Sequence, residues 1–253
     1  MKIGALAATA KLAFAFLLAQ SLAAQAAEVQ FFAGGGFRSV VNELAPAFER
    51  TTGHKIVATF DSAGGLERRI KAGESFDVLL IGASTFDALG GKIAPTPRVD
   101  VARAGLGVAV KAGTPKPDIS SVDAVKRVLV NAKSVAYVGE GHSGQYFVAM
   151  LDRLGIGEQM KPKLKPLGVA DVVKAGASGE AELVVYVIPG ILPDRGVELV
   201  GPLPAEIQSY VSLTAALSTA AKEPEAGKAF IAFLTSDAAM AVIKAKGWEP
   251  AAP

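Results

Sequence analysis

Cysteine is absent from the 253 residues, which excludes disulfides, thiol chemistry and cysteine-ligated metals. The chain also has no large excess of one charge, because 26 basic residues stand against 24 acidic ones. The basic residues are scattered and do not form the basic patch of a nucleic-acid binder. The chain lacks the glycine patterns of nucleotide sites, the serine elbow of α/β-hydrolases and any metal-ligand spacing. We therefore expect no cofactor, no metal and no nucleic-acid partner.

Hydrophobic runs are short, and the first of them is typical of a secretory signal. Lys2 and Lys11 supply positive charge, residues 12–18 form an apolar core, and Ala24 and Ala26 mark a small-residue cleavage site. This core is shorter than the about 20 residues of a membrane-spanning helix, and no later segment is better suited. We predict a signal peptide over residues 1–27, export to the periplasm, and a soluble, monomeric mature protein.

Apolar β-type runs alternate with amphipathic helical stretches along the rest of the chain, as in a parallel sheet covered by helices on both faces. Strands are predicted at residues 29–33, 55–60, 76–81, 104–110, 134–138, 163–166, 183–188 and 210–219. Helices are predicted at residues 37–52, 64–72, 143–154, 170–177, 224–234 and 236–246, with another that is capped by Ser120 or Ser121 and reaches residue 131. The fold class is therefore α/β.

Prolines at residues 115 and 117 break regular structure, and we interpret residues 114–117 as a passage between two lobes. The two C-terminal helices carry apolar faces that we expect to pack back on the first lobe. The chain then crosses twice between the lobes. Lobe I is predicted at residues 28–108 and 213–253, lobe II at residues 109–212, and a ligand cleft between them.

Three glycine-rich loops follow predicted strands and open predicted helices. They read AGGGFRS at 33–39, DSAGG at 61–65 and GEGHSGQY at 139–146. Ligands of parallel sheets collect at such strand ends, where helix N-termini present unpaired amides and glycine lets a ligand approach the backbone. Tyr186 ends a strand and adds a hydroxyl from lobe II. Each loop alone can be a structural turn, but three at equivalent junctions favour a small-anion site.

Three segments carry a resemblance to a known family. They are EVQFFAGGGFRSVVNELAPAFERTTGHKI, TFDSAGGLERRIKAGESFDVLLIG and KAFIAFLTSDAAMAVIKAKGWEP. Together they resemble the periplasmic molybdate-binding proteins of ABC transporters and their relatives, over essentially the whole mature chain. The resemblance implies a type II periplasmic-binding-protein fold, a membrane permease as partner, and an oxyanion held by hydroxyls and amides without Lys or Arg.

Carried over residue by residue, the resemblance assigns the ligand to a set of loop positions from both lobes. These are Gly36 and Ala63 in lobe I and Ser143, Val169 and Tyr186 in lobe II, to which we add the neighbouring Gly35 and Ser62. Gly36 and Ala63 stand where the family has serines. Each charge-assisted bond is worth about 1.5 to 3 kcal/mol, so their loss should weaken binding of a molybdate-like or tungstate-like dianion.

An organic carboxylate is the alternative ligand. Arg38, one turn into the helix after the first loop, has a guanidinium that can bind a carboxylate through two hydrogen bonds, although it can equally be a solvated helix residue. Arg68 and Arg69 are interpreted as surface residues.

Relatives on this scaffold include aconitate isomerases, so an enzyme is the alternative to a binding protein. Moving an allylic proton needs a base that works near neutral pH, and the predicted cleft loops offer His142, Asp61 and Glu140. His142 is the best candidate, because it lies in a glycine-rich loop at a helix start. A surface histidine without a partner is the competing interpretation, and His54 is taken as one.

Overall fold

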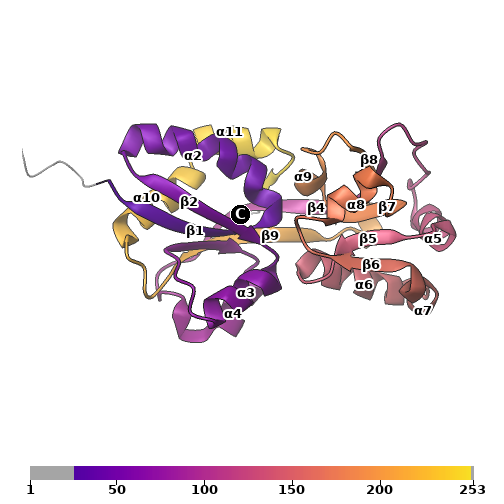
Figure 1. The fold of residues 1–253 in the computed structure, drawn as a ribbon, viewed down its shortest axis with the longest axis horizontal. Helices are drawn as coiled ribbons and strands as arrows, with labels where there is room; N and C mark the ends of the chain where they lie inside the picture. Colours follow the sequence, from indigo (N-terminus) through magenta and orange to yellow (C-terminus); the bar gives the residue numbers. More distant parts are fainter. Residues whose placement is uncertain (1–25, 252–253) are drawn as a thin grey trace, which may run out of the picture.

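Two lobes make up the described part of the chain, residues 26–251, in this computed structural model. Figure 1 shows a group of helices and strands on each side of the molecule, joined by β4 (Val99–Lys111) and β9 (Tyr210–Leu217). The prediction of a two-lobed α/β fold with two crossing segments is confirmed. The predicted signal peptide lies outside the described residues except for its last two positions.

Lobe I is built on five strands in the order β2–β1–β3–β9–β4. Its other elements are β1 (Glu28–Gly34), η1 (Gly35–Phe37), α2 (Arg38–Thr52), β2 (Lys55–Asp61), α3 (Ala63–Lys71), β3 (Val78–Ile81), α4 (Ser84–Leu89) and η2 (Gly90–Lys92). Strand β1 is parallel to β2 and β3, whereas β9 runs antiparallel to β3 and β4. Because parallel strands end at one edge, the loops after Gly34, Asp61 and Ile81 meet there.

The C-terminal helices α10 (Pro224–Leu234) and α11 (Asp237–Ala245) pack on lobe I, as predicted. In α2, Val40, Leu44 and Phe48 are spaced four residues apart, so they share one face and are all buried. Phe230 of α10 meets Phe48 with ring centroids 5.0 Å apart. This aromatic contact joins chain segments that are distant in sequence into one core.

Lobe II repeats the arrangement. Its elements are α5 (Val122–Asn131), β5 (Val135–Val138), α6 (His142–Arg153), α7 (Gly157–Met160), η3 (Lys161–Lys163), β6 (Leu164–Leu167), α8 (Val172–Ser178), β7 (Leu183–Val187), α9 (Ile188–Ile191), β8 (Val197–Pro202) and η4 (Ala205–Ile207). Ser121 caps α5, since its Oγ accepts from the Ala124 amide at 3.2 Å. Strand β5 is parallel to β6 and β7, so the loops after these three strands also share an edge.

The first crossing between the lobes lies inside β4. Residues 99–105 of this strand pair with β9 of lobe I, and residues 106–109 pair with β7 of lobe II. The interpretation of residues 114–117 as the passage is therefore wrong, because they follow β4 and already belong to lobe II. The exact lobe boundaries stay a prediction, since one strand path runs through both lobes.

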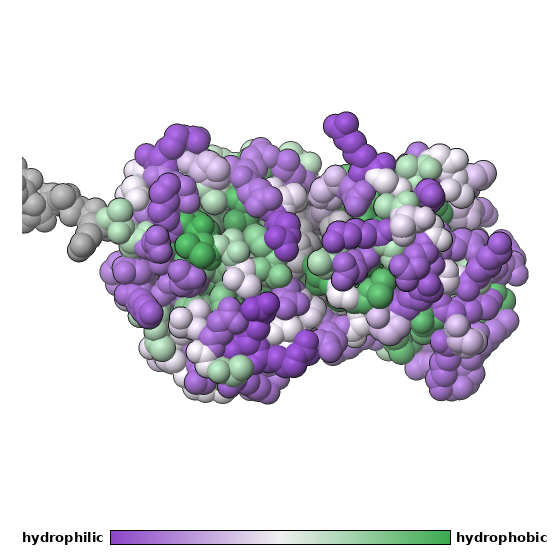
Figure 2. All heavy atoms as spheres, viewed as in Figure 1, coloured by the Kyte–Doolittle hydropathy of each residue, from purple (hydrophilic) through white to green (hydrophobic). Residues whose placement is uncertain are grey.

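Figure 2 shows mostly hydrophilic side chains over both lobes and a narrowing between them. Among the described helices, no single one has the length and apolar composition of a membrane span. Helices α10 and α11 reach that composition only as a pair, which is bent by 63°. Each of the two contributes buried residues to the core of lobe I.

Candidate functional site

A pocket lies where the strand ends of the two lobes face each other. Most of the predicted site residues line it: Gly35, Gly36, Ser62, Ala63, Ser143, Val169 and Tyr186, together with the alternative catalytic residue His142. The pocket leaves about 60 Å³ for the centres of water-sized molecules, which is room for several waters or one small anion. The structure thus brings together predicted site residues from Gly35 to Tyr186, which are 151 residues apart along the chain.

Gly35 lets the first loop of lobe I touch lobe II directly. A Cβ built on Gly35 would lie 1.9 Å from Cγ1 of Val169, so any side chain there would collide with the opposite lobe. At Gly36, a Cβ would lie 2.9 Å from Cγ2 of Val187 and 3.6 Å from Oη of Tyr186. The two glycines therefore set how closely the lobes approach.

Ser62 is buried at the N-cap of α3, where its Oγ accepts a hydrogen bond from the Gly65 amide at 3.0 Å. A hydroxyl that accepts still holds one hydrogen, which Ser62 can donate into the pocket. Its own backbone amide is committed, because it donates to Oδ1 of Asp61 at 2.7 Å. The second loop therefore offers the Ser62 hydroxyl and the first-turn amides of α3 to a ligand.

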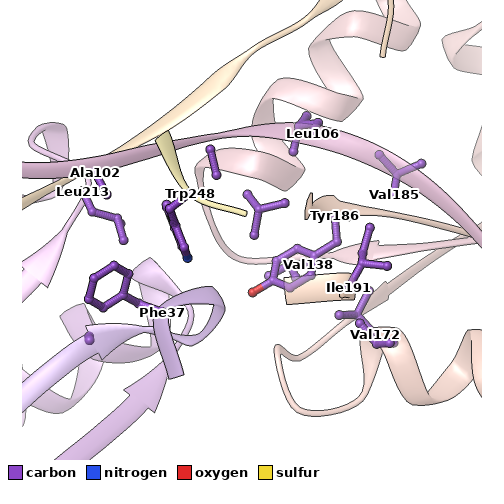
Figure 3. Packing of buried hydrophobic residues seen from close by; sticks show 14 of the residues in the cluster. Phe37, Ala102, Leu106, Val138, Val172, Val185, Tyr186, Ile191, Leu213 and Trp248 are labelled. Atoms are coloured by element: carbon purple, nitrogen blue, oxygen red, sulfur yellow. The ribbon is translucent and has the colours of Figure 1, made fainter. Parts of the chain in front are cut away.

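Lobe II contributes two hydroxyl groups. Ser143 is buried in the first turn of α6, and Tyr186 lies near the end of β7 with 5% of its surface exposed. Burial raises the pKa of the Tyr186 phenol well above its usual value, so the side chain stays protonated and keeps a hydrogen to donate. Figure 3 shows its hydroxyl directed toward the side on which Phe37 and Trp248 lie.

Trp248 is a pocket residue that sequence reasoning missed. It stands between α11 and the short strand β10 (Glu249–Pro250), which pairs with β4, and only 3% of its surface is exposed. Its ring meets Phe37 edge-on, with centroids 5.3 Å apart. The one available signal was that Trp248 is the only tryptophan of the chain. No periodicity indicates that a C-terminal segment reaches the cleft.

No Lys or Arg lines this pocket among the described residues. Two acidic residues do, Asp61 and Glu140, and each is paired with an arginine. Nε of Arg69 lies 3.3 Å from Asp61 within lobe I, and Arg68 bonds Glu140 across the two lobes. These ion pairs offset part of the negative charge at the pocket's rim, since Arg69 also pairs with Glu74 at 3.0 Å.

Arg38, predicted as a ligand contact, is not on the pocket wall. Its guanidinium lies 4.4 Å above the ring of Phe60. It lines an adjoining depression together with Lys174 and Arg195, and this depression shares Gly35, Gly36, Val169 and Tyr186 with the pocket. Arg38 therefore faces the part of a ligand that would extend from the pocket into this depression.

His142 lines the pocket, and its Nε2 forms a hydrogen bond with Oγ of Ser84 in the opposite lobe. Burial lowers the pKa of His142, so the ring is neutral at pH 7 and can accept a proton. His54, in contrast, accepts from the Ala27 amide at 3.2 Å, at the start of β1. Of the two histidines, only His142 lines the pocket.

Residues 29–249 match the family of bacterial extracellular solute-binding proteins. The chain is 32% identical over 247 residues to an aconitate isomerase from a Pseudomonas species, covering 93% of this chain and 94% of that protein. It is 29% identical over 236 residues to the molybdate-binding protein ModA of Azotobacter vinelandii, covering 89% and 91%. The solved structure of the A. vinelandii periplasmic molybdate-binding protein aligns with a TM-score of 0.74 at 20% identity, over 87% of this chain and 98% of that one, which shows a common fold.

Proposed function

The chain belongs to the bacterial extracellular solute-binding proteins, and from this premise we propose that it captures a small anion between its lobes and delivers it to an ABC-transporter permease. In this proposal residues 1–27 direct export, and the mature protein works in the periplasm as a monomer. The observation that carries the proposal is the pocket between the lobes, into which Ser62, Ser143 and Tyr186 bring hydroxyl groups from both sides.

An anion suits this pocket although no cation lines it. Hydroxyl and amide donors replace the water that a desolvated anion loses, and each charge-assisted bond is worth about 1.5 to 3 kcal/mol. The carboxylates of Asp61 and Glu140 repel the ligand less because Arg69 and Arg68 form ion pairs with them. Neutral donors from both lobes also make ligand binding and lobe closure one event, which fits capture and release.

The ligand is proposed to be an organic carboxylate, with a molybdate-like or tungstate-like oxyanion as the second candidate. Gly36 and Ala63 offer no hydroxyl, which lowers the number of donors available to a tetrahedral dianion. The adjoining depression with Arg38, Lys174 and Arg195 provides positive charge for a ligand that extends out of the pocket. Relatives named for molybdate and for aconitate are both similar to this chain.

A thermal-shift screen of the mature protein tests the proposal. The panel contains molybdate, tungstate, sulfate, phosphate and organic acids, including both isomers of aconitate. A ligand at 100 times its dissociation constant adds about 2.7 kcal/mol of stability, which gives a clear rise in melting temperature. Stabilisation by carboxylates alone supports the preferred ligand, and stabilisation by molybdate or tungstate supports the second one. A protein that no anion stabilises would contradict the proposed function.

A second candidate function is isomerisation of a tricarboxylate such as aconitate, and His142 favours it. A neutral imidazole in the pocket can remove an allylic proton, the double bond then shifts, and the proton returns to the far carbon. This isomerisation needs no oxidant, and His142 ends in the same protonation state in which it began. Proton nuclear magnetic resonance of trans-aconitate in deuterated water tests it: conversion to the cis isomer by wild type, and none by His142→Gln, is expected of the enzyme.

A further inference from the structure

The indole nitrogen of Trp248 is a buried donor without a hydrogen-bond partner among the described residues. Only one other side-chain polar atom shares this condition there, Oγ of Ser39. Buried donors in proteins are almost always paired, because an unpaired one loses its hydrogen bond to water on folding and gains nothing in return. An indole N–H can only donate, so the missing partner must be an acceptor.

Trp248 is held firmly in place, so its position is not that of a loose chain end. Strand β10 pairs Glu249 with Arg103 of β4, and the two side chains form an ion pair at 3.0 Å. The preceding Gly247 has φ 85°, a left-handed conformation that turns the chain out of α11. These constraints, with the edge-on contact to Phe37, fix the ring against the cleft.

The Trp248 ring and the Tyr186 hydroxyl approach the same point. A Cβ on Gly36 would lie 3.5 Å from Cζ2 of Trp248 and 3.6 Å from Oη of Tyr186. Cζ2 belongs to the six-membered ring, beside the atom that carries the indole nitrogen. Figure 3 shows Trp248 between Phe37 and Tyr186, with its nitrogen at the end of the ring that extends into the gap. Because residue 36 is a glycine, no side chain stands between the Trp248 ring and the Tyr186 hydroxyl, and Val187 bounds the same space, with Cγ2 at 2.9 Å from such a Cβ.

We propose that Trp248 is a ligand-binding residue, whose indole N–H donates, beside the Tyr186 hydroxyl, to one negatively charged oxygen of the bound anion. The inference rests on the proposed function and adds to it the residue that selects the ligand. Tyr186 comes from lobe II and Trp248 from a segment paired to β4, so a shared oxygen ties the two lobes together. The group they hold is a carboxylate or oxyanion oxygen, because two donors converge on it.

The single tryptophan makes the test direct. In protein labelled with nitrogen-15, the side chain of Trp248 gives the only indole N–H cross-peak. Sodium molybdate and trans-aconitate are titrated separately, and calorimetry records whether each binds. For an anion that binds, the indole proton is expected to move downfield, with the same midpoint as the heat, and to exchange more slowly with water.

Two outcomes separate the inference from the proposed function. Heat of binding with an unchanged indole resonance overturns the role of Trp248 and leaves the function standing. Absence of heat with both anions, together with no stabilisation by any anion of the thermal-shift screen, overturns both. Because this experiment uses the wild-type protein, it does not depend on a variant that folds.

A variant adds the energetic readout. Trp248→Phe keeps an aromatic ring but removes the N–H, and the loss of one charge-assisted bond should weaken binding about tenfold to a hundredfold. Phe230→Leu is the matched control, since it shrinks an aromatic residue of the same core that does not line the pocket. The control is expected to lower the melting temperature while keeping wild-type affinity. Equal affinity in Trp248→Phe and wild type contradicts the inference.

Discussion

Gly35 of lobe I and Val169 of lobe II touch so closely that a Cβ on the glycine would lie 1.9 Å from Cγ1 of the valine. The contact forms only when the lobes are together, and it is a wall of the pocket. Gly35→Ala is therefore expected to hold the lobes apart and weaken ligand binding at least tenfold, with little change in the melting temperature of the ligand-free protein.

The double variant Gly35→Ala, Val169→Ala is the matched control, because removing the two valine methyl groups relieves the 1.9 Å clash and leaves Cβ of residue 169, at 3.0 Å, as the nearest atom. It should recover most of the affinity, and small-angle scattering should show ligand-induced compaction in the double variant but not in the single one. Wild-type affinity in Gly35→Ala would mean that the lobes do not close on this contact.

Tyr186→Phe tests the hydroxyl that lobe II brings to the pocket. The substitution leaves the ring and its packing in place, so the expected loss of binding is that of one charge-assisted bond, about tenfold to a hundredfold. Isothermal calorimetry measures it. Tyr137→Phe provides the control, because Tyr137 is also a buried tyrosine of lobe II and does not line the pocket. If Tyr186→Phe and Tyr137→Phe both bind with wild-type affinity, the Tyr186 hydroxyl does not contact the ligand.

Arg38→Ala distinguishes a small from an extended ligand. The guanidinium lies over Phe60, in the adjoining depression and not on the pocket wall. Affinity for an organic carboxylate that reaches the depression should fall several-fold, whereas affinity for molybdate should not change. Calorimetry with both anions checks this, and an equal loss for both would show that Arg38 acts through the protein's general charge.

His142 should make the stability of the protein depend on pH. Burial lowers its pKa in the folded state below the about 6.5 of an unfolded chain, so the unfolded state takes up the proton first. The stabilising contribution is full above pH 6.5 and is lost as the pH falls toward the folded-state pKa. Urea unfolding at several pH values measures this slope.

His142→Gln should flatten the slope in that window, whereas His54→Gln, which alters the chain's other histidine, should keep it. Because both variants replace a histidine by glutamine, a difference between their slopes comes from the position of His142 in the pocket. A slope that survives in His142→Gln would assign the pH dependence to other groups.

Much of the fold followed from local patterns. The four-residue spacing in α2 and the apolar runs of β1, β2 and β7 predicted these elements, and each predicted end lies within one residue of the observed one. Strand β8 was not predicted, because its sequence VELVGP ends in glycine and proline and lacks an alternating pattern. The first crossing was misplaced because β4 is one uninterrupted strand that changes partners, and partners are not visible in sequence.

The sequence by itself determined the alternation of strands and helices, the three glycine-rich loops and the placement of a serine at the start of α3. These depend on spacing along the chain and on the conformational needs of single residues. Only the tertiary structure decided that Trp248 belongs to the pocket, that Arg38 stacks on Phe60 outside it, and that Arg68 bonds Glu140 across the lobes. Each of these contacts joins residues whose distance is set by sheet pairing and lobe approach, and no local pattern carries that distance.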